Sequence, residues 1–204
     1  NRVAGDGCSE LCMEETSYQC TEPVAPQAGT EIVVDGSFEQ NALQGAWKVS
    51  YEDYNPIYLY TESDIPAPSD GMYYLWFGGV PEEENASVSQ IVTIPDTATN
   101  LTFDLFVHAC DSDEDYMEVL IDRTPVYTTK PCTLTEDFER ASVDISAFAD
   151  GRRHTVQFRS EVFAANGGWS SFLVDRVSIS DNQPLLGQSS VCTVTWQSNT
   201  SSRP

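Results

Sequence analysis

The sequence predicts an all-β protein with antiparallel strands, and three observations support this fold class. The stretch Ser87–Asp122 contains three runs in which apolar side chains alternate with polar ones, and Leu101–Val107 is the clearest of them. A period of two places every second side chain on one face of a strand, so each run can bury one face and expose the other. β-Branched and aromatic residues dominate, and the three- and four-residue apolar spacing of a helix is missing. The interruptions at Pro95 and at Asp111–Asp115 carry turn-forming residues.

Charge and cysteine usage limit the classes of function. The net charge is -22, from 32 acidic and 10 basic residues, so nucleic acid and anionic membrane surfaces are not expected partners, because both need clustered Lys and Arg. Membrane insertion is not expected either, because no apolar run approaches about eighteen residues. Six cysteines without paired CxxC spacing predict disulfides in an oxidising, extracellular compartment. The start at Asn1 fits a processed fragment of an exported precursor.

Four segments follow one another along the chain. Residues 1–22 are short, turn-rich and contain three cysteines, so this segment needs disulfides to be stable. Residues 23–29 form a linker rich in proline and alanine. Residues 30–181 form the main domain, and residues 182–204 form a polar extension. The extension holds one more alternating run, Val191–Trp196, for which the sequence offers no obvious partner strand.

Within the main domain, short predicted strands are separated by turns every eight to twelve residues, which is typical of a β-sandwich. One helical turn is expected at Ser146–Gly151. Outside Ser87–Asp122 the predicted strands lie near Ile32–Val34, Trp47–Tyr60, Met72–Phe77, Arg123–Tyr127, Phe138–Ile145, His154–Arg159 and Phe172–Ile179.

Two predictions concern disulfides. Cys110 and Cys132 stand at the ends of neighbouring predicted strands, and a bridge between them closes a loop of about 23 residues and stabilises the fold by about 3 kcal/mol. The remaining cysteines are three near the N-terminus and one near the C-terminus. A bridge from the N-terminal segment to the C-terminal strand and an intermolecular bridge are both open. These cysteines are Cys8, Cys12, Cys20 and Cys192.

Several short motifs of the main domain occur in a characteristic order. They are Asp35–Glu39, Gly71 with Trp76–Gly79, Gln90 before Ile94-Pro95, Glu118 with Ile121-Asp122, Val143–Ser146, and Phe172 with Val174–Val177. With these motifs, the region Thr30–Ser180 resembles the jelly-roll accessory modules of secreted bacterial proteins, which are related in architecture to MAM domains and to carbohydrate-binding modules. The resemblance implies a jelly-roll β-sandwich. It says little about function, because one fold hosts many ligands.

A second resemblance concerns the N-terminal segment. The run Gly5–Ser9, followed by Cys12, Glu14, Tyr18 and Cys20, resembles the closing half of a cysteine-rich repeat common in secreted myxobacterial and marine bacterial proteins. The first half of that repeat is missing here, so the disulfide pairing of the family cannot be transferred. Both resemblances imply an extracellular or cell-surface protein of bacterial type.

Calcium is the cofactor that the jelly-roll resemblance implies. In the resembled modules, an acid in the first strand and an Asp in the last strand bind a structural calcium ion, and these positions correspond to Glu39 and Asp175. A hard cation with carboxylate ligands from both strands would close the sandwich. Hydrogen-bonded carboxylates are the alternative interpretation. Arg176 stands where the family usually has a second acid.

The acidic loop is a second calcium candidate. Asp111, Asp113 and Asp115 form a D-x-D-x-D pattern, together with Glu114. An EF-hand is not expected, because Tyr116 stands where the tight turn of that loop requires glycine. A looser surface calcium site and a solvated acidic loop are the two remaining interpretations.

The sequence gives little support for catalysis. Only His108 and His154 are available, and the motifs of zinc proteases, serine hydrolases and phosphate-binding loops do not occur. We therefore expect no enzyme activity. Aromatic residues could instead stack on sugars, and the best surface candidates are Tyr51, Tyr54 and Trp169.

Two functions follow from these observations. The first is a non-catalytic extracellular structural or adhesive subunit, which self-associates into fibres or a surface layer by donating a strand and contains structural calcium. The alternative is a carbohydrate-binding accessory module of a secreted bacterial hydrolase, with a polysaccharide as its partner. Edge-strand addition supports the first, because an unpaired strand can join a neighbouring sheet. The density of aromatic residues supports the second.

Overall fold

The computed structural model describes residues 30–40, 45–52, 54–59, 66–163 and 169–181, together with the backbone of 18–19 and 193–194. The chain divides into two compact units. One unit is Gly29–Gln183, and the other combines Asn1–Ala28 with Pro184–Pro204. The larger unit is therefore inserted in sequence between the two parts of the smaller one.

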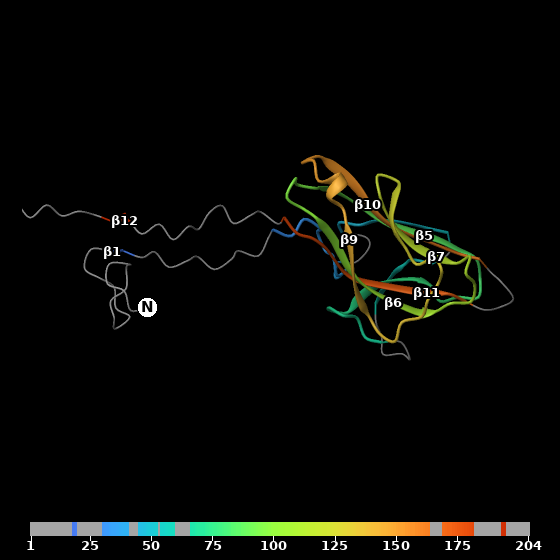
Figure 1. The fold of residues 1–204 in the computed structure, drawn as a ribbon. Coiled ribbons are helices and arrows are strands. Elements are labelled where there is room, and N and C mark those ends of the chain that lie inside the picture. The colour runs from blue at the N-terminus through green and yellow to red at the C-terminus, as the bar shows by residue number, and fades with distance from the viewer. Residues whose placement is uncertain are drawn as a thin grey trace, which may run out of the picture. The chain divides into compact units, whose positions relative to one another are not determined.

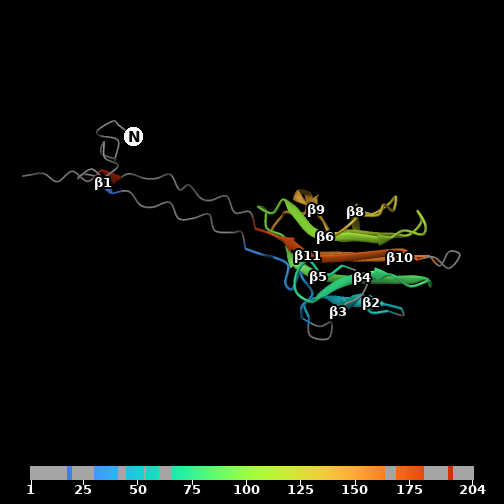
Figure 2. The ribbon, with the colours of Figure 1, turned by 90° about the horizontal axis from the view of Figure 1, so that it is seen from below.

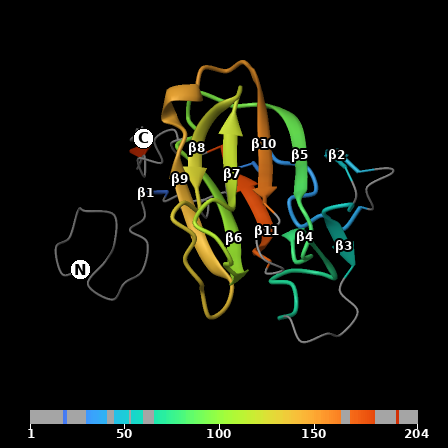
Figure 3. The same ribbon diagram turned by 90° about the vertical axis from the view of Figure 1, so that its right-hand side faces the viewer.

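The larger unit contains two five-stranded antiparallel sheets. Sheet 1 has the strand order β2-β5-β10-β7-β8, as Figure 3 shows, and sheet 2 has the order β3-β4-β11-β6-β9, as Figure 2 shows. In sheet 1 the strands are β2 (Lys48–Tyr51), β5 (Glu84–Thr93), β10 (Arg153–Val162), β7 (Tyr116–Ile121) and β8 (Thr124–Thr128). In sheet 2 they are β3 (Ile57–Leu59), β4 (Tyr73–Gly78), β11 (Ser171–Ile179), β6 (Asn100–Ala109) and β9 (Glu139–Asp144).

The two sheets lie face to face and bury the core between them (Figure 1). Alternation decides which side chains enter: in β6, Leu101, Phe103, Leu105 and Val107 all belong to the core cluster. The rings of Phe103 and Phe158 meet edge to face with centroids 5.3 Å apart. Burying a side chain of this size contributes about 1.5–3 kcal/mol. The all-β class and the antiparallel sandwich predicted from the sequence are confirmed.

The predicted helical turn is present as a 3-10 turn, η1 (Ser146–Phe148). The predicted return after Ile121 is a tight hairpin in which Asp122 and Arg123 have φ values of 50° and 70°. Positive φ at both central residues matches the right-handed twist of the flanking strands. Strand β8 then begins at Thr124.

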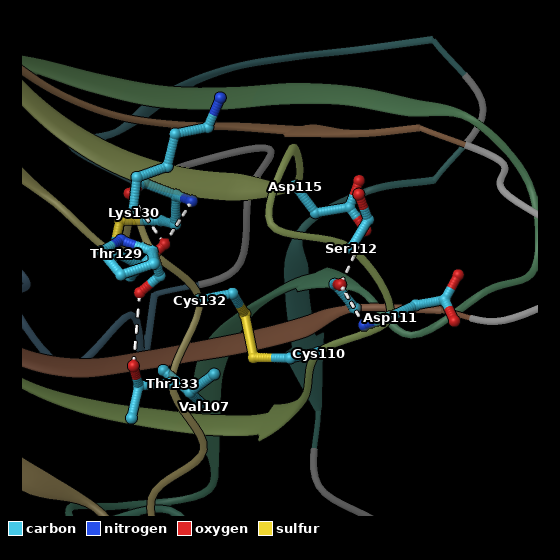
Figure 4. The surroundings of a disulfide bond; sticks show 12 residues. Val107, Cys110, Asp111, Ser112, Asp115, Thr129, Lys130, Cys132 and Thr133 are labelled. Carbon is cyan, nitrogen blue, oxygen red and sulfur yellow. Dashed lines mark hydrogen bonds between the residues drawn. A yellow bond between two sulfur atoms is a disulfide. The ribbon is translucent and has the colours of Figure 1, made fainter.

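The disulfide Cys110–Cys132 is present, with a Cα–Cα distance of 5.9 Å (Figure 4). It joins the end of β6 to the segment that follows β8, two places that neighbour each other only in the folded chain. This predicted bridge is confirmed. The other four cysteines, Cys8, Cys12, Cys20 and Cys192, lie outside the described residues, as do most of the predicted N-terminal segment and linker.

In the smaller unit, β1 (Tyr18–Gln19) pairs antiparallel with β12 (Thr193–Val194). Tyr18 lies opposite Val194, and Gln19 lies opposite Thr193. Within the run Val191–Trp196, the described residues Thr193 and Val194 therefore pair with a strand of their own chain. The sequence did not reveal this partner, because it stands at the opposite end of the chain.

Candidate functional site

Sheet 2 carries apolar side chains on its outer face as well as on its core face. In β4, Leu75 and Phe77 enter the core, so Tyr74 and Trp76 point to the opposite side. The outer face of an antiparallel sheet is usually polar. Here Tyr74, Phe106 and Leu173 form a second buried cluster, and Tyr58, Trp76 and Phe138 pack against it.

These six residues, which we call the outer cluster, come from all five strands of sheet 2 or their immediate ends. The rings of Tyr58 and Trp76 meet edge to face with centroids 4.8 Å apart. Phe138 lies 5.8 Å from Phe106, again between ring centroids. The indole N–H of Trp76 donates to Ser171 Oγ at 2.9 Å. The ring positions are therefore fixed by packing and by hydrogen bonding.

A charged network lies next to the outer cluster on the same face. Pairing places Asp104 between Asp175 of β11 and Arg140 of β9. Asp104 is only 6% exposed. Arg140 Nη1 donates to Asp104 Oδ1 at 2.8 Å and to the Arg176 carbonyl at 2.9 Å, and its Nη2 donates to Thr102 Oγ1 at 2.7 Å. Arg176 Nη1 lies 3.5 Å from Asp104 Oδ2. One buried carboxylate thus holds two guanidinium groups.

Two hollows adjoin this network. The larger has a volume of about 600 Å³, and its lining is Ala67–Ser69, Asp104, Asp137, Phe138, Arg140 and Arg176. The smaller has about 280 Å³, and its lining is Glu31, Val33, Gly36, Ser37, Asp70, Arg140, Arg176, Val177 and Ser178. The larger volume is within the range of about 300–1,000 Å³ typical of small-molecule sites.

A third hollow of about 560 Å³ lies beside β8 and β9, and its lining includes four threonines, Lys130, Leu134, Glu139 and Arg140. Its aromatic residue, Tyr127, packs edge to face on Phe103 of the core, with centroids 5.2 Å apart. This ring is partly buried, as is Phe138 of the larger hollow on sheet 2. Unlike the two hollows on sheet 2, the third hollow is lined neither by Arg176 nor by an aspartate.

Asp175 fixes one wall of both hollows. Its side chain is fully buried, and its Oδ2 accepts from the Asp70 amide at 2.9 Å and from Ser69 Oγ at 3.2 Å. Its Oδ1 accepts from the Arg176 amide at 2.7 Å. Burial raises the pKa of Asp175 to about 6, although the three hydrogen bonds oppose this shift. The carboxyl therefore holds both the 69–70 loop and the bulge of β11.

Glu39, the other predicted calcium ligand, binds the continuation of that loop. Its Oε1 accepts from the amides of Met72 and Tyr73 at 2.9 and 2.8 Å. Gly71 has a φ of +66°, and a Cβ there would lie 2.2 Å from the Glu39 carboxyl carbon. Only glycine fits this position without rearrangement.

The donors around Glu39 and Asp175 are N–H and O–H groups, which compete with a cation for the same oxygens. Among the residues that the structure describes, no group of three or more acidic, histidine or cysteine side chains is placed to hold a metal ion. Calcium normally takes six to eight oxygen ligands. Calcium at Glu39 and Asp175 stays a prediction that chelation can test.

The acidic loop does not form one convergent cluster. Asp111 and Asp113 are exposed, whereas Asp115 is fully buried. Asp115 Oδ1 accepts from the Phe163 amide at 2.8 Å, and its Oδ2 accepts from Ser170 Oγ at 2.7 Å. Figure 4 shows the side chains of Asp111 and Asp115 lying apart from each other. Asp115 thus joins the start of β7 to the end of β10 and the start of β11.

The predicted aromatic candidates belong neither to the outer cluster nor to the linings of the two hollows on sheet 2. Tyr51, Tyr54 and Trp169 are 48%, 43% and 49% exposed. Tyr51 ends β2 opposite Ala86, near the start of β5, and Trp169 precedes β11. They therefore lie toward the loops at one end of the sandwich, and their role in binding stays a prediction.

The outer cluster was not recognised from the sequence. The usable signal was β4 itself: Tyr73, Tyr74, Trp76 and Phe77 put bulky rings on both faces of one short strand. When a strand is apolar on both faces, either both faces are covered by other parts of the protein or one face binds a ligand. Arg140 and Asp104 gave no signal, because they are 36 positions apart and meet only through strand pairing.

Comparison with known proteins identifies the fold. No family model matches the sequence, and no curated protein matches it. Among solved structures, the carbohydrate-binding module TmCBM61 in complex with beta-1,4-galactotriose is similar, with 12% identity, a TM-score of 0.53 and coverage of 74% of this chain and 99% of that chain. The K3 cleaved adhesin domain of Lys-gingipain from Porphyromonas gingivalis is similar with 13% identity, a TM-score of 0.50 and coverage of 74% and 99%. The chain therefore has the jelly-roll β-sandwich fold of these structures.

Proposed function

We propose that this protein is a non-catalytic, extracellular carbohydrate-binding module whose ligand lies along the outer face of sheet 2. The observation that carries the proposal is the meeting of the outer cluster with the network of Asp104, Arg140 and Arg176 beside a hollow of about 600 Å³. A sugar presents apolar C–H faces and a rim of hydroxyl groups. Rings match the faces, and paired carboxylate and guanidinium groups match the hydroxyls.

The two halves of the face have separate tasks. Phe138 lines the larger hollow and is only partly buried, so part of its ring is available for contact with a sugar ring. Asp104 and Arg140 hold each other in place before any ligand arrives. Preorganised donors and acceptors lose little conformational entropy on binding. Hydrogen bonds to charged groups contribute about 1.5–3 kcal/mol each.

Further observations support this choice. The two similar structures reported above, one of them bound to galactotriose and the other an adhesin domain, share the fold with this chain. The disulfide Cys110–Cys132 fits an oxidising, extracellular compartment. The structure contains no helix long and apolar enough to cross a membrane within the residues it describes.

The surroundings of His154 support a non-catalytic role for this residue. His154 is only 8% exposed, and its two ring nitrogens lie 2.7 Å from Asp122 Oδ2 and 2.9 Å from Asp150 Oδ1. Both nitrogens are thus engaged in tying together the ends of β7 and β10. Such a histidine supports the fold rather than proton transfer to a substrate.

A structural or adhesive subunit is the second candidate. The adhesin domain with the same fold favours it. However, the reasoning for strand donation relied on an unpaired C-terminal strand, and β12 pairs with β1 of its own chain. Sedimentation of the full chain at increasing concentration tests self-association, and polymers that form without any glycan would favour this candidate.

Affinity electrophoresis tests the carbohydrate-binding proposal. The gels contain β-1,4-galactan, mixed-linkage β-1,3-1,4-glucan, xylan or polygalacturonate, and the wild type runs beside Phe138→Ala. We expect retardation of the wild type by at least one polysaccharide and an affinity loss of about tenfold, or 1.4 kcal/mol, for Phe138→Ala. Near-ultraviolet circular dichroism verifies that the variant is folded.

Trp169→Ala is the matched control, because it removes a ring that is 49% exposed and lines neither hollow. It should migrate like the wild type. If Trp169→Ala is no longer retarded while Phe138→Ala is still retarded like the wild type, the binding site lies in the loops and not on sheet 2. If no polysaccharide retards the wild type, the proposed function is wrong.

A further inference from the structure

Arg176 occupies an unusual backbone position at the boundary of the proposed site. The pairing of β11 with β6 shifts between Asp175 and Ser178, which marks a β-bulge. Arg176 has a φ of 50°, a conformation rarely adopted by residues other than glycine. The next residue, Val177, returns to the core, and its amide donates to the Gly36 carbonyl at 2.9 Å. The bulge thus turns the Arg176 side chain outward, away from the core.

The backbone of the bulge is held on both sides. The Arg176 amide donates to Asp175 Oδ1 at 2.7 Å, and its carbonyl accepts from Arg140 Nη1 at 2.9 Å. A Cβ on Gly36 would lie 1.9 Å from the Val177 carbonyl oxygen, so the neighbouring segment can pack this closely only with glycine. Such bulges often re-aim a side chain at a functional site.

The two arginines of the network differ in how their donors are used. Arg140 donates three hydrogen bonds to protein acceptors. The Arg176 guanidinium has an ion pair with Asp104 at 3.5 Å and donates no hydrogen bond to the described part of the chain. Its side chain is 52% exposed. A guanidinium has five N–H donors in a planar fork, so Arg176 keeps donors for a ligand.

Arg176 also stands where the two hollows meet, because both are lined by Arg140 and Arg176. The larger hollow adds the carboxylates of Asp104 and Asp137, and the smaller adds those of Glu31 and Asp70. Each hollow is therefore lined by two acids and two bases. Neither lining has a positive excess to attract an anion, and the net charge of -22 opposes one.

We infer that Arg176 is the residue that determines specificity: its guanidinium donates paired hydrogen bonds to two oxygens of an uncharged oligosaccharide that occupies both hollows. This inference rests on the proposed function. It adds three points to that function. The sugar is neutral, the oligosaccharide is long enough to extend past Arg176, and the planar group of donors of a guanidinium is needed at this position. Lysine, with a point charge on a flexible stem, cannot replace that geometry.

Isothermal titration calorimetry tests the inference with oligosaccharides of two to six units, prepared from β-1,4-galactan, mixed-linkage glucan and xylan. Oligogalacturonides of the same lengths are the charged counterpart. In the wild type, affinity for the preferred neutral series should rise about tenfold between two and four units as the second hollow fills. Oligogalacturonides should bind more weakly than that series.

Three variants separate the possible roles of Arg176. Arg176→Gln should lose about tenfold in affinity for the longer neutral chains and most of the dependence on length. Arg176→Lys should recover only part of this loss. Arg153→Gln removes the same charge at an exposed position in β10 and should bind like the wild type.

The outcomes distinguish the inference from the function beneath it. If Phe138→Ala weakens binding but Arg176→Gln binds within about twofold of the wild type, the carbohydrate site stands and the inference is wrong. The inference is also wrong if oligogalacturonides bind more tightly than every neutral series, with an affinity that falls as salt rises. Absence of binding to every probe would remove both the function and the inference.

Discussion

Glu84, at the start of β5, offers a quantitative test of how this fold treats buried acids. The side chain is only 3% exposed. Its Oε2 accepts from the Gly78 amide at 2.9 Å, whereas Oε1 has no hydrogen-bond partner in the described structure. Burial, opposed by that single hydrogen bond, raises the pKa of Glu84 from 4.5 to about 7. The change to make is Glu84→Gln, which removes the charge and keeps an oxygen for Gly78.

The direction of the pH effect follows from linkage. A carboxyl whose pKa is raised by folding favours the protonated state in the folded protein. Its contribution to stability is therefore fully present below pH 4.5 and is lost as the pH rises through about 7. One pKa unit corresponds to about 1.4 kcal/mol, so ionised Glu84 costs about 3 kcal/mol of folding free energy at pH 8. The unpartnered amide of Gln adds a cost of about 1–3 kcal/mol that does not depend on pH.

Urea unfolding of the wild type and Glu84→Gln between pH 4 and pH 8 measures this effect. The free energy of unfolding of the variant, minus that of the wild type, should increase by about 3 kcal/mol over this range. Glu83→Gln, which removes an exposed carboxylate from the adjacent position, should give a nearly constant difference. A difference for Glu84→Gln that stays within about 0.5 kcal/mol across the range would show that our account of Glu84 is wrong.

Three further predictions concern cross-links and calcium. Replacing Cys110 and Cys132 together by serine should lower the free energy of unfolding by about 3 kcal/mol, because the bridge spans a sequence separation of 22. If urea unfolding shows that this free energy falls by less than about 1 kcal/mol, the entropic explanation is wrong. The second prediction is a disulfide between Cys20 and Cys192, which follows if the pairing of β1 with β12 continues by one residue. Peptide mapping without reductant should find the two peptides that contain these cysteines joined. A bridge from Cys192 to another cysteine or to a second chain would refute this prediction. If calcium binds at Glu39, a chelator should lower the melting temperature of the wild type by several degrees and leave that of Glu39→Ala unchanged. Identical melting temperatures of the wild type with and without chelator would exclude the site.

The strands could be predicted because their signal is local. In β6, the alternation of Leu101, Phe103, Leu105 and Val107 is visible in consecutive residues, and the structure buries all four. The disulfide Cys110–Cys132 was predictable for a related reason, since both cysteines follow or precede recognisable strands. A period of two and a turn residue can be recognised in the sequence without knowing which strands are neighbours in the sheet.

The candidate site was harder to predict, because it depends on strand order and register. Phe106, Leu173 and Trp76 meet across three strands that are consecutive in sheet 2 but not in sequence. The acidic loop illustrates the same difficulty. Asp115 reads as a solvated residue of that loop, but Ser170 and Phe163, far along the chain, supply its buried hydrogen bonds. The number of aromatic residues in the sequence suggested that exposed rings such as Tyr51 and Trp169 bind the ligand. The outer cluster, by contrast, forms only because the pairing of strands brings its residues together.

The central claim is that a carbohydrate lies on the outer face of sheet 2, and amide chemical shifts measured by NMR during titration test it most directly. With the polysaccharide that retards the wild type supplied as soluble oligosaccharides, we expect the largest shifts at Thr102–Phe106, Phe138–Ser142 and Arg176, with small shifts at Tyr51 and Trp169. Shifts concentrated around Tyr51 and Trp169, with none along β6 and β9, would contradict the account.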